Sequence, residues 1–174
     1  MMPSSKEEQA LIWDYYKPRH THAWNMLVLS WRELDQPDDE ATIDFEVEYY
    51  WENFIIRLWL YRTTVKTLTK LAEVKNEAET ALSTFDSVFD VGGRNGLKAL
   101  RDMYEHFDDY AAGIGYGPAS RAENLDPWRF ISRDRYERGQ FVLDRKQSYD
   151  AAIKLHSDAK CVSDKLIQWL KSSR

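Results

Sequence analysis

The chain has 174 residues, a length that suits one domain able to bury a core of its own. Its 43% hydrophobic and 30% charged residues are typical of a globular protein, and its net charge of −5 argues against a general nucleic-acid binder. The single cysteine, Cys161, excludes an internal disulfide and a multi-cysteine zinc site. No apolar run approaches the roughly 18 residues of a membrane span, and residues 1–9 do not resemble a signal peptide. We therefore expect a single cytoplasmic domain over residues 1–174, with no membrane partner.

The first 42 residues predict two helices and a loop. Glu7–Tyr16 is predicted to begin a helix, and Pro18 is predicted to end or break it. A second amphipathic helix is indicated by apolar residues at i, i+3, i+4 and i+7, namely Trp24, Leu27, Val28 and Trp31. The polar stretch Asp35–Thr42, which contains Pro37, predicts a loop.

A long helix is predicted next, over roughly Asp44–Lys75. Its apolar stripe follows the helical period and comprises Trp51, Phe54, Ile55, Leu58, Tyr61, Val65, Leu68 and Ala72. Its exposed positions are expected to be Arg57, Arg62, Lys66 and Lys70. A further helix is predicted over Glu77–Phe89, with a buried side formed by Ala81, Leu82, Phe85 and Val88.

Glycines interrupt the pattern after this helix. Gly92, Gly93 and Gly96 favour a turn, since the Lys-Ser/Thr pair and the spacing of a phosphate-binding loop are absent. Asn95 or Gly96 is expected to cap a helix over Leu97–Ala111.

The last third begins with a glycine-rich stop at 113–118 and an aperiodic stretch at 119–138. Apolar residues around 136–143 predict a short strand or hairpin, and a final helix is predicted over Gln147–Lys171. One side of that helix is expected to carry Tyr149, Ala152, Ile153, His156, Ala159, Leu166 and Leu170. The fold class is therefore all-α: a helical bundle of four to five helices with a short irregular or β-hairpin insertion before the last helix.

Most of the reactive side chains favour structural roles. His20 and His22 are two residues apart beside Pro18, in a predicted turn. Side chains with this spacing do not lie on one face of a helix, so we do not expect the pair to bind a metal ion. His156 lies on an apolar stripe and is expected to be a hydrogen-bonded core histidine. Cys161 is expected to be structural, in mid-helix. No metal or cofactor site is predicted.

One segment of a predicted amphipathic helix combines residue types suited to catalysis. It is Arg101-Asp102-Met103-Tyr104-Glu105-His106. His106 lies away from the apolar stripe, and Asp102, four residues earlier, could orient its imidazole. A histidine near neutrality can transfer protons at a ribose hydroxyl or a leaving oxygen, and an arginine can bind the phosphate and its developing charge. The same residues also form ordinary i,i+4 pairs, Arg101–Glu105 and Asp102–His106, of the kind that stabilise a solvated helix.

At these residues the segment resembles the HEPN superfamily, helical-bundle proteins that include many RNA-cleaving toxins and defence proteins. The hallmark of that superfamily is an arginine, usually followed by Asn, Asp or His, with a histidine a few residues further on. The resemblance implies a metal-independent endoribonuclease that acts as a homodimer, with its motifs facing each other across the interface. His106 would be the catalytic acid/base, Arg101 the phosphate-binding group and Asp102 the supporting polar residue, with RNA as substrate and an antitoxin protein as a further partner.

Two other functions stay open from the sequence. A non-catalytic helical interaction module would use the many aromatic residues to bind a partner chain. A bundle that binds a small molecule or a nucleotide is the third alternative.

Overall fold

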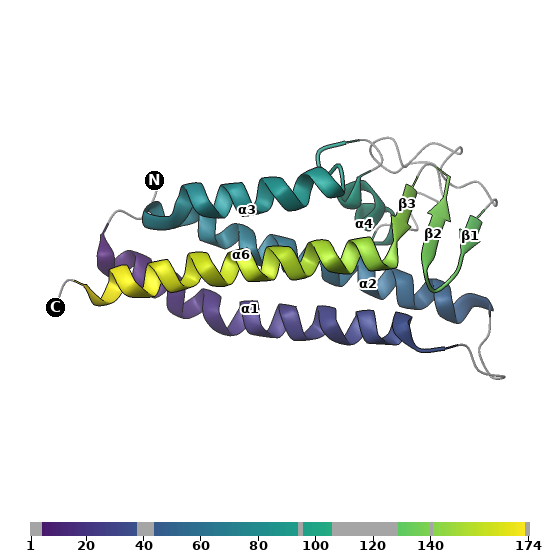
Figure 1. The fold of residues 1–174 in the computed structure, drawn as a ribbon, viewed down its shortest axis with the longest axis horizontal. Coiled ribbons are helices and arrows are strands. Elements are labelled where there is room, and N and C mark those ends of the chain that lie inside the picture. Colours follow the sequence, from purple (N-terminus) through teal and green to yellow (C-terminus); the bar gives the residue numbers. More distant parts are fainter. Residues whose placement is uncertain (1–4, 38–43, 94–95, 106–128, 140, 173–174) are drawn as a thin grey trace.

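The computed structural model describes residues 5–37, 44–93, 96–105, 129–139 and 141–172. The long helices lie side by side along the molecule, and a small sheet stands with the short helix α4 at one end (Figure 1). The helices are α1 (Lys6–Asp35), α2 (Asp44–Val65), the 3-10 helices η1 (Lys66–Lys70) and η2 (Ala72–Val74), α3 (Lys75–Val88), α4 (Leu97–Glu105) and α6 (Arg145–Lys171). The strands are β1 (Arg129–Ile131), β2 (Arg135–Arg138) and β3 (Phe141–Asp144). The predicted all-α bundle with a short insertion before the last helix is confirmed.

The prediction that Pro18 ends a helix is wrong, because α1 continues through Pro18 without a break. A proline removes one backbone donor and disturbs the preceding turn, which costs stability in a helix interior. Here Pro18 is exposed, while Tyr16 and Leu27 on the same helix are buried at 2% and 0% exposure. Packing on both sides of the proline therefore holds one long helix, whose start is fixed by a capping box between Ser5 and Glu8.

Helix α2 ends ten residues before the predicted Lys75, and 3-10 turns carry the chain on to α3. The predicted stripe from Trp51 to Leu68 is buried throughout, but Ala72 is exposed because the helical period is lost after Val65. Arg62, predicted to be exposed, is 9% exposed and forms an ion pair with α3.

Helices α3 and α6 pack on each other, and each has one residue predicted to be buried that is exposed instead. Val88, the last residue of α3, is 42% exposed, and Ile153 of α6 is 45% exposed. The buried line of α6 runs through Ala152, Leu155 and Ala159, and Ile153 lies about 100° around the helix from Ala152.

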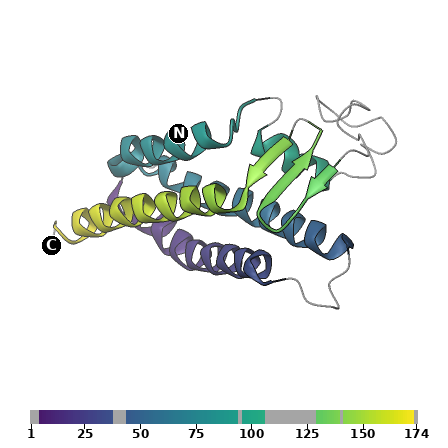
Figure 2. The same cartoon turned by 45° about the vertical axis from the view of Figure 1, so that its right-hand side comes forward.

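The insertion is a three-stranded antiparallel sheet of order β1-β2-β3. Tyr136 pairs with Ile131 on one side and with Leu143 on the other, and Gly139 makes the β2–β3 turn with a φ of 57°. The sheet lies against the end of α2 (Figure 2), where the indole Nε1–H of Trp51 donates to the Ser132 carbonyl at 2.6 Å. No helix within the described ranges is long and apolar enough to span a membrane.

Candidate functional site at the α2–α4 junction

Arg101 lies on α4, which packs along α2. Its guanidinium stands 5.0 Å from the centre of the Trp59 ring of α2, and its side chain is only 16% exposed. It forms an ion pair with Glu105, one turn further along α4, and its Nη1 lies 3.2 Å from a carboxylate oxygen of Asp102. The predicted Arg101–Glu105 pair is therefore present, and a cation–π contact with the Trp59 ring helps to hold the guanidinium in place.

Asp102 bridges two cations in this structure. Besides Arg101, it accepts a hydrogen bond from the Lys98 ammonium at 2.5 Å. His106 lies outside the described residues, so its pairing with Asp102 and its distance from Arg101 stay predictions. What the structure adds is that α4 is helical up to Glu105, the residue directly before His106.

A second arginine approaches the same indole. The guanidinium of Arg62 lies 5.3 Å from the Trp59 ring and binds Asp86 of α3 with two hydrogen bonds, of 2.9 and 2.5 Å. Arg62 thus donates from Nε and Nη2, whereas the Nε atoms of Arg101 and of Arg138 on β2 are buried and have no hydrogen-bond partner among the described residues. A buried donor without a partner costs free energy, so the Nε–H of Arg101 has the capacity to donate to one more acceptor oxygen.

A neighbouring cluster under the sheet was missed from the sequence. The Tyr104 hydroxyl of α4 donates to the Tyr136 hydroxyl of β2 at 2.7 Å, and Arg138 of β2 pairs with Glu48 of α2 at 3.2 Å. Burial, followed by the charge of Glu48, raises the pKa of Glu52 on the next turn of α2. Burial also raises the pKa of Tyr104, so its hydroxyl stays protonated.

Tyr104 and Arg101 are three residues apart on α4, so the cluster under the sheet continues the Arg101 site. Within the described residues each cation of this junction has a carboxylate partner, and Glu52 is a further carboxyl group beside Glu48 and Arg138. The pairs are Arg62–Asp86, Lys98–Asp102, Arg101–Glu105 and Arg138–Glu48. An anion that binds here must compete with these carboxylates, and both Glu105 and Asp102 contact Arg101.

The histidines of α1 and α6 form a separate, structural cluster. The Tyr61 hydroxyl lies 2.8 Å from Nδ1 of His156 and 3.0 Å from Nε2 of His20, which confirms the prediction of a hydrogen-bonded His156. His20 and His22 lie in α1 rather than in a turn, because the helix passes through Pro18, and His22 is exposed. No group of three metal-ligating side chains exists among the described residues.

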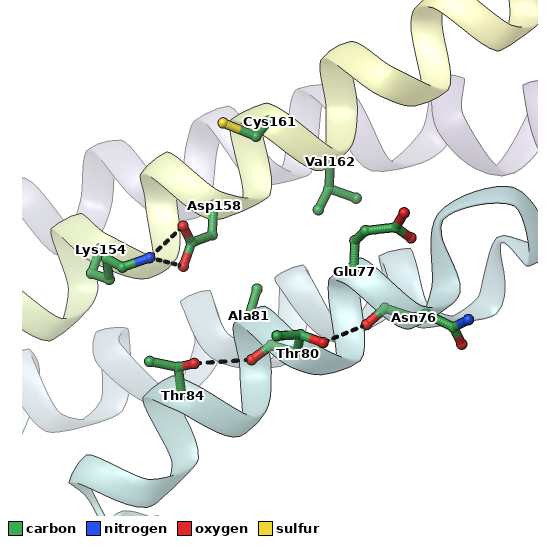
Figure 3. A pocket seen from close by; sticks show the side chains of 9 residues that line it. All are labelled: Asn76, Glu77, Thr80, Ala81, Thr84, Lys154, Asp158, Cys161 and Val162. Atoms are coloured by element: carbon green, nitrogen blue, oxygen red, sulfur yellow. Dashed lines mark hydrogen bonds and ion pairs between the residues drawn. The ribbon is translucent and has the colours of Figure 1, made fainter.

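A shallow groove between α3 and α6 holds Cys161 (Figure 3). Cys161 lies in the middle of α6, as predicted, and it is a free cysteine that is exposed to solvent. Several polar side chains around it have partners on their own helix. Lys154 forms an ion pair with Asp158, and the Thr80 and Thr84 hydroxyls donate to backbone carbonyls of α3. The groove therefore brings together no set of residues able to do chemistry.

Comparison with protein-family models, with curated proteins and with solved structures returned no match for this chain.

Proposed function

We propose that the chain is a metal-independent endoribonuclease of HEPN type, with its site at the α2–α4 junction. In this proposal Arg101 binds the scissile phosphate, His106 transfers protons as the acid/base, and Asp102 supports them. The observation that carries it is the state of Arg101. Its guanidinium is held against Trp59 and keeps one buried N–H without a partner.

A phosphate suits this guanidinium for a physical reason. Arginine binds phosphate oxygens through two parallel N–H groups, and such charge-assisted bonds are about twice as strong as neutral ones. Asp102 and Glu105 both contact Nη1 of Arg101, so its Nε–H and the parallel N–H of Nη2 can provide this pair. The indole of Trp59 keeps the guanidinium in place, so little side-chain entropy is lost on binding.

The proposal includes an assembly. Two copies would bring two motifs together, so that the two His106 side chains divide the acid and base roles. A protein that cleaves cellular RNA harms its own cell, and an antitoxin partner that covers the site would suppress it. A toxin or defence role follows from this activity.

The test is a gel assay of labelled RNA with purified protein in excess chelator. We expect cleavage by the wild type and loss of cleavage in His106→Ala. The matched control is His22→Ala, which removes an exposed histidine on α1 and should leave cleavage unchanged. Equal cleavage by wild type and His106→Ala would mean that a contaminating nuclease or another residue does the chemistry.

A second candidate function, a helical module that binds another protein, is favoured by one different observation. Several large apolar side chains are exposed on α1 and α2, namely Leu11, Tyr15, Leu29, Tyr49 and Leu60. This surface does not bear on RNA cleavage, and both functions can belong to one chain.

A further inference from the structure

Helix α1 is apolar on two sides. One side is buried in the bundle, and the other carries Leu11, Tyr15 and Leu29, which are 71%, 56% and 50% exposed. At 100° per residue these three side chains lie within about 40° of one another around the helix. They form a single stripe about 27 Å long, from the rise of 1.5 Å per residue. Exposed apolar residues gathered on one side of a helix mark an interaction site more often than isolated ones do.

A groove between α1 and α2 continues this stripe in its middle. Its volume is about 430 Å³, and its apolar lining includes Pro18 and Met26 from α1 and Leu60 from α2. Leu60 is itself 40% exposed, although it lies in the middle of a tightly packed helix pair. The stripe has the length of a helix of about five turns.

Two arginines border the groove, Arg19 from α1 and Arg57 from α2. Arg19 lies over the ring of Tyr15 at 3.6 Å, and Arg57 donates from Nε to the amide oxygen of Asn53 at 3.3 Å. Neither has a carboxylate partner among the described residues. This sets them apart from Arg101 and the other arginines of the α2–α4 junction, each of which has one.

We propose that the α1–α2 groove binds an amphipathic helix of a partner protein whose apolar face is flanked by acidic side chains. The apolar lining would take up the side chains that such a helix places at i, i+3 or i+4 and i+7. The unpaired guanidinium groups of Arg19 and Arg57 are complementary to Asp or Glu on its flank. The whole chain carries a net charge of −5, so these two arginines are not part of a generally basic surface. They would repel a partner helix that carries basic side chains at the same positions. The inference does not depend on RNA cleavage.

The test uses two synthetic helical peptides of about 18 residues with identical leucines at i, i+4, i+7 and i+11. One has glutamates beside the leucines and the other has lysines, and both are labelled for fluorescence anisotropy against the full-length protein. We expect the glutamate peptide to bind and the lysine peptide to bind at least about tenfold more weakly. Arg57→Glu should weaken the binding of the glutamate peptide and strengthen the binding of the lysine peptide. Leu60→Gln should weaken the binding of both peptides. The matched control, Lys160→Glu, makes the same charge change on the exposed side of α6 and should alter neither.

Three results would overturn the proposal. The first is no binding of the glutamate peptide by the correctly folded protein, and the second is equal binding of both peptides. The third is self-association in sedimentation experiments that Leu60→Gln abolishes, because the occupant would then be a second copy of this chain. Circular dichroism of each variant separates loss of binding from loss of folding.

Discussion

The His20–Tyr61–His156 cluster makes a sharp prediction about acid stability. Both imidazoles share one hydroxyl, and that hydroxyl has a single proton to donate. One histidine therefore donates to Tyr61 and the other accepts from it, which requires at least one neutral ring. The rings also stack, with the centre of the His156 ring 4.0 Å from that of Trp24 and 5.3 Å from that of His20. Protonation of both rings would leave the hydroxyl without an acceptor and place two positive charges side by side.

The magnitude follows from the pKa of His20. Burial, followed by repulsion from His156, lowers this pKa from 6.5 to about 4. Burial, followed by the charge of Lys160, also lowers the pKa of His156. Between pH 6.5 and pH 4 the unfolded chain binds a proton at His20 that the folded chain does not, so the free energy of unfolding falls as the pH falls. At 1.36 kcal/mol per pH unit the full loss is about 3 kcal/mol, and solvent access to the ring reduces it to about 2 kcal/mol.

Urea denaturation at pH 7 and at pH 4.5 measures this loss directly. We expect the wild type to lose about 1–2 kcal/mol more than His20→Gln between the two pH values, because glutamine keeps a hydrogen-bonding group but does not titrate there. The control His22→Gln removes an exposed histidine from the same helix and should follow the wild type. If wild type and His20→Gln lose the same free energy, His20 is not responsible and the reasoning fails.

Two further predictions concern the stability of the turn before α4 and of the contact between α2 and α3. A Cβ added at Gly96 would lie 1.7 Å from the backbone oxygen of Asp90, so Gly96→Ala should lower the free energy of unfolding by more than about 2 kcal/mol. The control Gly92→Ala places its Cβ in open space and should be nearly neutral. Thermal unfolding of both variants measures the difference. Arg62→Ala should cost about 2–3 kcal/mol in urea unfolding, because it leaves the Asp86 carboxylate without its partner at the α2–α3 contact. Comparable stability of Arg62→Ala and wild type would show that this ion pair contributes nothing.

The helical period predicted most of the core correctly because packing follows it closely. Trp51, Phe54 and Leu58 are fully buried, as the stripe predicted. The prediction at Pro18 is wrong because tertiary packing overrides a local preference. Pro18 is exposed, and the contacts of α1 on either side of it outweigh its local penalty.

The candidate site was only partly readable from the sequence. Arg101 and Asp102 lie on a helix and Arg101 pairs with Glu105, both as predicted, whereas the pairing of Asp102 with Lys98 was not predicted. Trp59 could not be connected to Arg101, since the contact depends on how α4 docks on α2. Tyr136 and Arg138 lie in a stretch without helical periodicity, and only the sheet brings them to Tyr104.

The most direct test of the proposed function compares the two partners of one ion pair, Arg101 and Glu105. Single-turnover RNA cleavage in chelator should fall by about 100-fold or more in Arg101→Ala, because the group that binds the phosphate is lost. In Glu105→Gln it should rise by about threefold to tenfold, because the carboxylate that competes with the phosphate is lost. Opposite effects would support phosphate binding by Arg101. If both variants cleave RNA at the wild-type rate, or neither they nor the wild type cleave it, the pair only stabilises α4 and the proposal is contradicted.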